Sequence, residues 1–399
     1  MKKSLIRRIP RKAWSFLNVI NRLVPKDKNR IFLYSNLGFR DNIKAVFDYL
    51  IENGYNNRYK IIVSLNNWEN FAETAEENVE YINNTKGLFK FFRSKYCYYC
   101  FGKYPVKPAK GQMVFNLWHG MPLKRVGNMV RGQEKVDYNY FTHLLCTSEY
   151  FRDIMKQSFN ASDKQIVICG QPRTDEMLDD IPIEYEMAAK TALMSYEDRI
   201  AKMMLWLPTY REGAESELDI LNITDLEKLD KLMDENGWCM IVKLHPLSKF
   251  RRNPGRYRHI NFIDDKTLQK EHIGFYSLIG MSDCLITDYS SVYFDYLLLD
   301  RPMAFAVSDI YDYTRDRGFT VSDPTTIMPG DMIKNSADFL AFAEKMMKGK
   351  DDFSAWRKRL NKQFNRYADN RNCSRVTGMI PRSAAERAIP YMQYIEKNK

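Results

Sequence analysis

The chain has 399 residues, of which 45% are hydrophobic, 14% aromatic and 28% charged. It is long enough for two domains of ordinary size and too apolar for a disordered protein. No segment reaches the roughly 18 uninterrupted apolar residues of a membrane-spanning helix, and the N-terminus lacks the apolar run and cleavage site of a secretory signal. We therefore expect the chemistry to take place in the cytosol.

The positive charge of the chain is concentrated at its N-terminus. Of the net charge of +11, residues 1–30 contribute +9 (ten Lys and Arg against one Asp), which leaves +2 for all the others. Apolar residues recur there every three or four positions, which predicts a basic amphipathic helix, continuous from about residue 11 because Pro10 interrupts it. Such a helix suits an anionic membrane surface, and the alternative is packing on the protein's own body. The residues expected at the membrane are Arg7, Arg8, Arg11, Lys12, Trp14, Phe16 and Leu17.

After residue 29, short apolar runs alternate with helical periodicity, which predicts parallel sheets covered by helices. The first series has strands at 30–35, 59–65, 113–118, 143–147 and 165–169, and helices at 42–52, 87–93 and 148–159. A polar, partly helical connection follows over 174–200. The second series has strands at 203–207, 238–243, 260–263, 284–287 and 303–307, and helices at 225–236, 271–281 and 291–299, before a helical tail from residue 336.

Two successive α/β series predict two Rossmann-like, doubly wound domains that face each other across a cleft. The predicted divisions are a basic attachment segment at 1–29, a first domain at 30–180, a connection at 181–200, a second domain at 201–380 and a C-terminal helix at 381–399. The seven cysteines are an odd number in apolar stretches, which indicates reduced, buried thiols. Cys97 and Cys100 form a lone CxxC without the second pair of a zinc ribbon, so we place them in a buried aromatic strand.

Four clusters of polar residues lie where predicted strands end, the edge at which open α/β sheets bind ligands. The first contains His119, an imidazole beside the permissive backbone of Gly120. The second contains Arg211, a potential fork for phosphate, and the third is His245 followed by Pro246. The fourth cluster precedes a helix, where hydroxyls and free N–H groups can hold a pyrophosphate. Taken singly, helix capping is the commoner role of such residues, and a lone histidine is more often structural.

The four clusters and several further motifs follow one another in a fixed order along the chain. These are Trp118-His119-Gly120, Lys124, Gly127, Gly-Gln-Pro-Arg-Thr-Asp at 170–175, Pro-Thr-Tyr-Arg at 208–211, Lys-Leu-His-Pro at 243–246, Thr-Asp-Tyr-Ser-Ser at 287–291, Asp295, Arg301-Pro302, Asp309, Tyr313 and Arg-Gly-Phe at 317–319. As a set they resemble the CDP-glycerol glycerophosphotransferase family, the teichoic acid primases and polymerases, over about residues 30–380.

The resemblance implies a GT-B type fold, with an acceptor-side domain at 30–180 and a CDP-donor domain at 201–380. It implies transfer of glycerol phosphate from CDP-glycerol to a hydroxyl of a lipid-linked glycan, or of a growing teichoic acid or capsule chain, with release of CMP. It also implies peripheral attachment to the cytoplasmic face of a bacterial cell membrane.

The resemblance further implies a role for each site residue. His119 is expected to be the base, and His245 to contact the donor phosphates or assist departure of the leaving group. The residues expected to hold the donor phosphates are Arg211, Thr287, Ser290, Ser291 and Arg317. Supporting residues are expected at Lys124, Asp288, Lys243 and Asp295. No Asp-x-Asp pair follows these strands and no His/Cys cluster has metal-ligand spacing, so we expect neither a bound metal nor a cofactor.

Several alternatives stay open at this point. The donor can be CDP-ribitol instead of CDP-glycerol, or the enzyme can be a nucleotide-sugar glycosyltransferase on the same architecture. A non-catalytic polyanion-binding protein is a further alternative. Nucleic-acid binding is not expected, because the basic charge lies on one segment. The sequence also leaves open whether the protein forms a homo-oligomer. It favours the addition of only a few polyol phosphate units to each acceptor, because no extended basic track for a long anionic product is evident.

Overall fold

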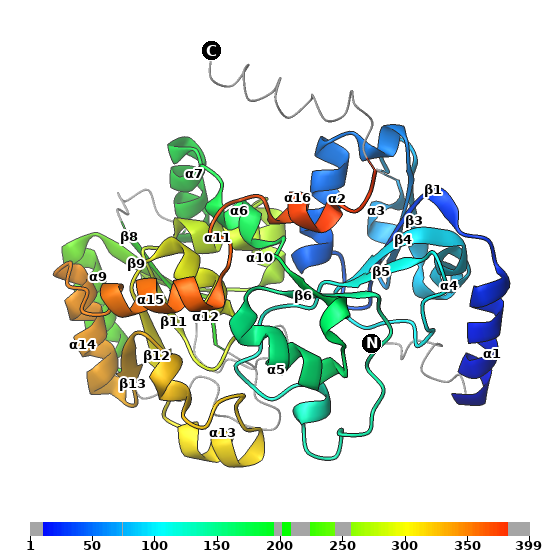
Figure 1. Ribbon diagram of the computed structural model, residues 1–399. Coiled ribbons are helices and arrows are strands. Elements are labelled where there is room, and N and C mark those ends of the chain that lie inside the picture. Colours follow the sequence, from blue (N-terminus) through cyan, green and yellow to red (C-terminus); the bar gives the residue numbers. More distant parts are fainter. Residues whose placement is uncertain (1–10, 74, 195–201, 209–223, 244–256, 382–399) are drawn as a thin grey trace. The chain divides into compact units, whose positions relative to one another are not determined.

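The computed structural model describes residues 11–73, 75–194, 202–208, 224–243 and 257–381. The chain folds into two α/β units, each built on one parallel sheet (Figure 1). Unit 1 comprises Met1–His119, Gly127–Asp175 and Arg371–Lys399, and unit 2 comprises Gly120–Val126 and Glu176–Asn370. The predicted α/β class with two parallel sheets is confirmed.

The sheet of unit 1 has the strand order β3-β2-β1-β4-β5-β6-β7, so the direction of winding reverses between β1 and β4. Ligands of doubly wound folds bind at the carboxyl ends of the strands beside this switch point. The carboxyl-terminal half of β1, from Ile31 to Ser35, is buried throughout, as expected for a parallel sheet with helices on both faces. The strands are β1 (Asp27–Ser35), β2 (Lys60–Leu65), β3 (Val79–Asn83), β4 (Ser94–Tyr99), β5 (Met113–Asn116), β6 (His143–Cys146) and β7 (Ile166–Ile168).

The helices of unit 1 begin at local signals in the sequence. The side chain of Asn83, for example, caps α4 by accepting a bond from the backbone N–H of Lys86. The helices are α1 (Arg11–Leu23), α2 (Asp41–Glu52), α3 (Glu69–Ala72), α4 (Asn84–Arg93), α5 (Glu149–Phe159) and α16 (Asn372–Thr377), and α6 (Thr174–Leu178) lies where the chain passes to unit 2. In Figure 1, α16 lies beside α2, although the two are far apart in sequence.

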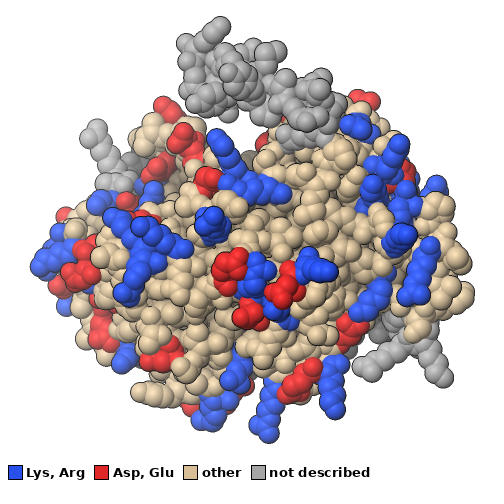
Figure 2. All heavy atoms as spheres, in the orientation of Figure 1, with Lys and Arg blue, Asp and Glu red and all other residues tan. Residues whose placement is uncertain are grey.

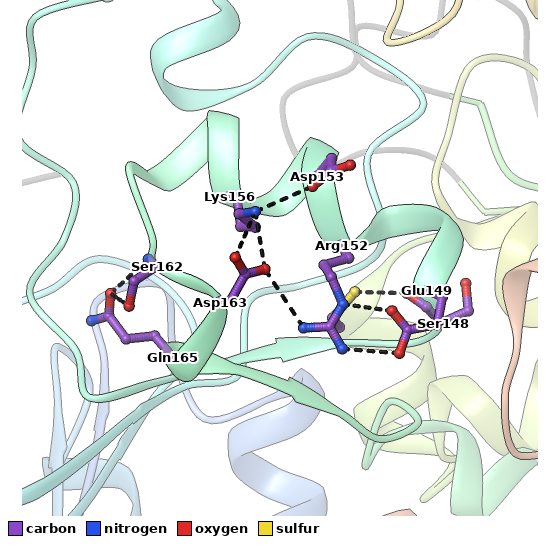
Figure 3. A network of polar contacts seen from close by, with 9 residues as sticks. Ser148, Glu149, Arg152, Asp153, Lys156, Ser162, Asp163 and Gln165 are labelled. Atoms are coloured by element: carbon purple, nitrogen blue, oxygen red, sulfur yellow. Dashed lines mark hydrogen bonds and ion pairs between the residues drawn. The ribbon is translucent and has the colours of Figure 1, made fainter.

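A network of charged side chains holds α5 against the turn that follows it (Figure 3). Arg152 binds Glu149 in a two-pronged contact and approaches Asp163. Lys156 also binds Asp163, at 2.9 Å, and Asp153 at 3.3 Å. The pKa of Arg152 is raised, mainly by its hydrogen bond to Glu149. The network thus joins the second half of α5 to Asp163 in the turn that follows the helix.

The sheet of unit 2 has the strand order β10-β9-β8-β11-β12-β13, so it repeats the winding of unit 1 and places its switch point between β8 and β11. Its core includes Trp206 of β8, which stacks on Phe339 at 5.3 Å. The strands are β8 (Lys202–Trp206), β9 (Trp238–Lys243), β10 (Ile260–Ile263), β11 (Cys284–Thr287), β12 (Met303–Ala306) and β13 (Asp331–Ile333). The helices are α7 (Ile183–Met194), α9 (Leu226–Asn236), α10 (Asp265–Lys270), α11 (Phe275–Met281), α12 (Val292–Tyr296), α13 (Ile310–Asp316), α14 (Ser336–Met347) and α15 (Ser354–Phe364), with the 3-10 turns η7 (Leu297–Leu299) and η8 (Pro324–Ile327).

The structure differs from the sequence predictions in some boundaries. The helix predicted at 271–281 begins only at Phe275, as α11, because His272 adopts the left-handed conformation (φ 55°) after α10 has ended at Lys270. The predicted connection at 181–200 contains α7, which contacts β10 and belongs to unit 2. Each predicted domain, 30–180 and 201–380, is one continuous range. The observed units are instead each made of more than one segment of the chain. Residues 120–126 pair with 318–320 in unit 2, and α16 packs on α2 in unit 1.

All seven cysteines are free and buried. Cys97 lies within β4 and Cys100 directly follows it, in agreement with a buried aromatic strand. Among the described residues, no helix is both long and apolar enough to cross a membrane. On the face drawn in Figure 2, basic and acidic side chains are interspersed.

Candidate active site

The predicted base, His119, lies just beyond the carboxyl end of β5 in unit 1. The chain turns sharply after Asn116, whose side-chain oxygen accepts a hydrogen bond from the N–H of Trp118 at 3.0 Å. Trp118 adopts the left-handed conformation with φ 51°, and Gly120 has φ 114°. Positive φ is ordinary for glycine but uncommon for a bulky residue such as tryptophan. The imidazole is therefore carried on an unusual turn at the edge of the sheet.

Aromatic rings fix the plane of the His119 imidazole. The ring stacks on Trp118 at 3.9 Å between centroids and on Phe101, beyond the end of β4, at 4.8 Å with an interplanar angle of 16°. Trp118 packs edge-on against Phe159, the last residue of α5. The guanidinium of Arg40 lies 5.6 Å from the centre of the Phe101 ring. The arrangement presents a half-buried, oriented imidazole with a cation nearby.

Helix α5 and the segment before β6 meet at a glycine that the family motif contains. Gly127 has φ 54°, and a Cβ on it would lie 1.9 Å from the carbonyl oxygen of Ser158 in α5. Only glycine allows so close an approach of two backbones. This contact places the end of α5, and with it Phe159, against Trp118.

In unit 2, the predicted donor turn follows β11 at the switch point. Asp288 and Tyr289 are buried, whereas Ser290 and Ser291 are half-buried. Ser291 occupies the N-cap position of α12 but makes no side-chain capping bond, so capping does not account for its hydroxyl. Because α12 has only five residues, its dipole adds little, and the two hydroxyls are the groups that this turn offers to an anion.

Thr287 has a different role from the direct phosphate contact that was expected. Its hydroxyl is fully buried and donates to the carbonyl oxygen of Leu207 at 3.0 Å. The bond joins the ends of β11 and β8. Thr287 therefore holds together the two strands that border the switch point.

The rings of Tyr313 and Phe319 pack against Tyr289 of the predicted donor turn. Tyr289 lies 4.4 Å from Tyr313 and 5.2 Å from Phe319 between ring centroids, and its hydroxyl donates to Asp309 at 2.9 Å. These residues come from separate motifs of the series found in the sequence. The structure thus brings the motifs at 287–291, 309, 313 and 317–319 together at one place in unit 2.

Two cationic residues of the motif series lie on adjacent segments of unit 2. Lys124 forms an antiparallel bridge with Phe319, and hydrogen bonds from Arg125 N to Gly318 O (3.1 Å) and from Thr320 N to Leu123 O (2.8 Å) flank it. Arg317 is exposed at the C-terminal end of α13. A segment that follows His119 in sequence therefore belongs to unit 2.

The other supporting residues have structural partners. Lys243, at the end of β9, pairs with Asp265 at 2.6 Å and lies over the Phe275 ring at 4.8 Å. Asp295 is buried in α12 and accepts a hydrogen bond from Tyr276 at 3.5 Å. Both side chains are thus engaged in contacts within unit 2.

Some predicted site residues lie outside the described part of the chain. Arg211, His245, Arg7 and Arg8 are among them, and so are the side chains of Arg11, Lys12 and Trp14. Strands β8 and β9, which precede Arg211 and His245 in sequence, are consecutive in the sheet, and β8 also pairs with β11. Within the described ranges, no three His, Cys, Asp or Glu residues gather closely enough to hold a metal ion.

Several residues around His119 were not predicted from the sequence. Phe101, Asp41, Asn42 and Arg173 all lie close to the turn that carries the imidazole. Arg173 belongs to the 170–175 motif, which the resemblance had singled out without a role. Of the other three, Asp41 and Asn42 lie in the first turn of α2 and Phe101 follows β4, and none of them had a local signal.

The comparisons with known proteins agree with this arrangement. The family model of CDP-Glycerol:Poly(glycerophosphate) glycerophosphotransferase matches residues 16–381. The chain belongs to this family. The enzyme class expected from the sequence, a CDP-glycerol glycerophosphotransferase, is confirmed, and this excludes the non-catalytic alternative.

Relatives of this transferase act in teichoic acid synthesis. It is 28% identical over 357 residues to the teichoic acid poly(glycerol phosphate) polymerase of Bacillus spizizenii, covering 83% of this chain and 86% of the relative. It is 25% identical over 354 residues to the teichoic acid poly(ribitol-phosphate) polymerase of the same organism, but spans only 55% of that protein. The solved structure of the wall teichoic acid polymerase TagF matches 94% of both chains with a TM-score of 0.73 at 19% identity, which supports the fold.

Proposed function

We propose that this transferase moves glycerol phosphate from CDP-glycerol to a hydroxyl of a lipid-linked glycan or of a growing teichoic acid or capsule chain, and releases CMP. The observation that carries the proposal is the convergence of the motif residues at the carboxyl edges of the two sheets. Unit 2 offers two serine hydroxyls and Arg317 near its switch point, and unit 1 offers an oriented imidazole. Hydroxyls and a guanidinium suit a pyrophosphate, and an imidazole suits the attacking hydroxyl.

In the proposed mechanism, the acceptor oxygen attacks the phosphorus that carries glycerol. His119 takes the proton of the acceptor hydroxyl, the new P–O bond forms, and the bond to the bridging oxygen breaks so that CMP leaves. Ser290, Ser291 and Arg317 stabilise the charge on the phosphates, together with Arg211. His245 contacts the donor phosphates or assists the departing CMP. No step uses a group outside the chain and its two substrates.

This mechanism assigns the donor to unit 2 and the acceptor to unit 1. Such a division is that of GT-B enzymes, in which two Rossmann-like domains face across a cleft, and we propose the same arrangement here. The identical order of the first six strands in both sheets supports it.

We test the donor by supplying CDP-glycerol, CDP-ribitol or a UDP-sugar with a lipid-linked disaccharide and identifying the released nucleotide and the product by mass spectrometry. The proposal predicts CMP and an acceptor heavier by one or more glycerol phosphate units. Release of a nucleoside diphosphate from the UDP-sugar, without turnover of either CDP-polyol, would replace the proposal by glycosyl transfer. Turnover of CDP-ribitol alone would replace glycerol by ribitol.

We further propose that α1 attaches the enzyme to the cytoplasmic face of the membrane. One side of the helix is fastened to unit 1, because the buried Asn21 donates to Lys107 O and Gln112 Oε1, both at 3.0 Å. Phe16, Val19 and Leu23 are 66%, 49% and 77% exposed. Apolar side chains exposed beside a strongly basic N-terminus suit an anionic leaflet.

The neighbouring helix α4 extends this apolar and basic surface. Phe89 is 65% exposed there, and Lys86 and Arg93 on the same helix are exposed as well. Helix α4 contacts α1 within unit 1. The two helices together supply exposed aromatic and aliphatic side chains with cations beside them.

The attachment is tested by flotation with vesicles that contain anionic lipid. Deleting residues 1–24 should move the protein to the soluble fraction, and so should the gentler change of Phe16, Val19 and Leu23 to Ser; high salt should weaken binding of the intact chain. A matched control changes Ile183 and Met187 to Ser, since these are equally exposed on α7. Undiminished vesicle binding of the α1 variants would exclude α1 as the anchor.

We also propose that the enzyme adds a small number of units to each acceptor. Outside residues 1–30 the chain carries only +2, and acidic side chains lie among the basic ones over much of the face drawn in Figure 2. A long anionic product would gain more from a continuous basic track. With donor in large excess, one or a few units on nearly all acceptors are expected. A ladder of tens of units on a small fraction of acceptors would contradict this.

A further inference from the structure

We propose that Asn42, in the first turn of α2, is the positioning residue for His119. Its side chain holds the peptide groups on both sides of Trp118 and thereby sets the direction in which the next residue, His119, leaves the sheet. This inference rests on the proposed role of His119 as the base.

The conformation of Trp118 needs an explanation of its own. With φ 51°, its Cβ is crowded against the backbone, an arrangement that is uncommon for any residue with a side chain and more so for a bulky one. Strained backbone persists only where the surroundings hold it. If Trp118 relaxed to negative φ, the chain after it would rotate, and the imidazole of His119 would point elsewhere.

The side-chain amide of Asn42 stabilises this conformation of Trp118. The fully buried side chain donates from Nδ2 to the carbonyl oxygens of Leu117 at 3.2 Å and Trp118 at 3.1 Å. These two carbonyls belong to the peptide groups before and after Trp118, and φ and ψ of Trp118 define the angle between those groups. One amide bound to both therefore fixes that angle.

The orientation of the Asn42 amide is itself determined by its partners. Carbonyl oxygens can only accept, so Nδ2 must face Leu117 and Trp118. On the other side, Oδ1 accepts the backbone N–H of Arg173 at 3.1 Å. Nδ2 also lies 2.6 Å from Oε1 of Gln171. The amide is thus tied to the 170–175 motif as well as to the turn that carries His119.

A second strained residue and a buried ion pair support Asn42. Asp41 also adopts the left-handed conformation (φ 60°), and its Oδ1 accepts the N–H of Asn42 at 2.7 Å. Its Oδ2 pairs with Nη1 of Arg173 at 2.7 Å, and Arg173 is only 4% exposed. On the other side, Sγ of Cys100 lies 2.8 Å from the carbonyl oxygen of Trp118. Two left-handed residues are thus joined through Asn42 and Cys100 beneath the candidate base.

The test is the isosteric change Asn42→Asp, which removes both N–H donors and keeps the size and the acceptor oxygen. We expect kcat to fall about tenfold or more while KM for CDP-glycerol stays within about threefold, because the donor is bound elsewhere. In a His119→Ala background the same change should have no further effect on kcat, because Asn42 acts through His119. A purely structural role would lower both backgrounds equally.

A matched control is Asn139→Asp in the same unit. Asn139 donates to Asn160 O at 2.7 Å and to Gln165 Oε1 at 3.0 Å, at the amino-end edge of the sheet, and its change should leave kcat unaltered. Asn42→Ser is a second variant, which does not add a negative charge. For every variant, the rate is divided by the fraction of folded protein, which thermal melts determine.

The outcomes separate this inference from the proposed function. If His119→Ala abolishes turnover but Asn42→Asp and Asn42→Ser keep the wild-type kcat, the positioning role is overturned and the base assignment stands. An equal loss from Asn42→Asp in both backgrounds also overturns it. A wild-type rate in His119→Ala removes both proposals at once.

Discussion

The two units repeat one order of strands but build the carboxyl edges of their sheets by different means. In unit 1, the segments after β1 and β5 contain two left-handed non-glycine residues, Asp41 at the start of α2 and Trp118. Buried polar contacts hold them, and they orient one imidazole ring. In unit 2, the turn after β11 contains no left-handed residue and offers two half-buried hydroxyls.

The difference follows from the chemistry that each edge has to perform. A base must be placed within hydrogen-bonding reach of one proton, so the chain that carries it is held rigidly. A pyrophosphate has many equivalent oxygens, and small hydroxyls with a cation nearby can bind it without a strained backbone. Unit 1 thus orients a single group, whereas unit 2 provides several groups of the same kind. Substitution of His119 in unit 1 should therefore lower kcat, whereas substitution of the phosphate-binding hydroxyls and Arg317 in unit 2 should raise KM for the donor.

The largest expected effect is in unit 1. His119→Ala should lower kcat by about a hundredfold or more without changing the melting temperature, because general base catalysis is lost. His143→Ala is the matched control, since His143 is half-buried at the start of β6 and bonds to the Thr142 hydroxyl. The rate of CMP release gives kcat for both variants. The same change at His245 should have an effect as large as that at His119, and a wild-type rate in either variant removes that histidine from the mechanism.

The next effect is in unit 2, and it should appear in KM. Arg317→Ala should raise KM for CDP-glycerol by about tenfold or more, because a charge-assisted contact to phosphate is lost. Arg315→Ala provides the control on the same helix, since Arg315 is exposed and pairs with Asp312 and Asp316. Initial rates over a range of donor concentrations separate KM from kcat. Equal behaviour of the two variants would show that Arg317 does not touch the donor.

A smaller change in the same constant is expected from the hydroxyls of the donor turn. Ser290→Ala combined with Ser291→Ala should raise KM for CDP-glycerol by a factor of about five, with little effect on kcat at saturating donor. Thr314→Ala is a control, because its hydroxyl donates only to the carbonyl of Ile310 on the exposed side of α13. If donor affinity is unchanged in the double variant, the turn has a structural role alone.

The smallest effect concerns stability and pH in unit 1. Burial raises the pKa of Asp175 to about 6, although the N–H groups of Asn372 and Cys373 donate to its carboxylate. Because the folded state holds this proton more tightly than the unfolded state, the contribution of Asp175 to the free energy of unfolding falls as the pH rises from about 4 to about 6. Asp175→Asn removes the titration, so stability should decline less, or rise more, across this range than in the wild type. Identical pH profiles from urea melts would contradict the shift.

Most of the strands could be predicted from the sequence because each is a short apolar run in a sheet that is buried on both faces, but β3 and β13 were not predicted. The strand predicted at 238–243 and the observed β9 coincide. The helix predicted at 271–281 is observed only from Phe275, because the apolar periodicity continues through Gly274, whereas the start of α11 depends on the backbone conformation of His272. The packing of 120–126 with 318–320 had no local signal, since it joins distant segments.

The site was predictable only as far as the motifs extended. His119, Ser290 and Ser291 stand in recognisable sequence contexts at strand ends, and Arg317 stands in a motif at the C-terminal end of α13. Asn42 and Phe101 do not, because their contacts with the turn at Trp118 and His119, a buried hydrogen bond and a ring stack, join segments that are distant in sequence. The sequence suggested a phosphate contact for Thr287, but the structure engages its hydroxyl with Leu207. Whether a hydroxyl faces a ligand or a neighbouring strand is decided by tertiary packing.

The most direct test of the proposed reaction follows one phosphorus atom. CDP-glycerol labelled with ³²P in the phosphate next to glycerol is incubated with the enzyme and a lipid-linked acceptor, and the products are separated. Attack on that phosphorus predicts labelled acceptor and unlabelled CMP. Labelled CDP with an unlabelled acceptor product would mean that the bond between carbon and oxygen breaks instead, and would contradict the account.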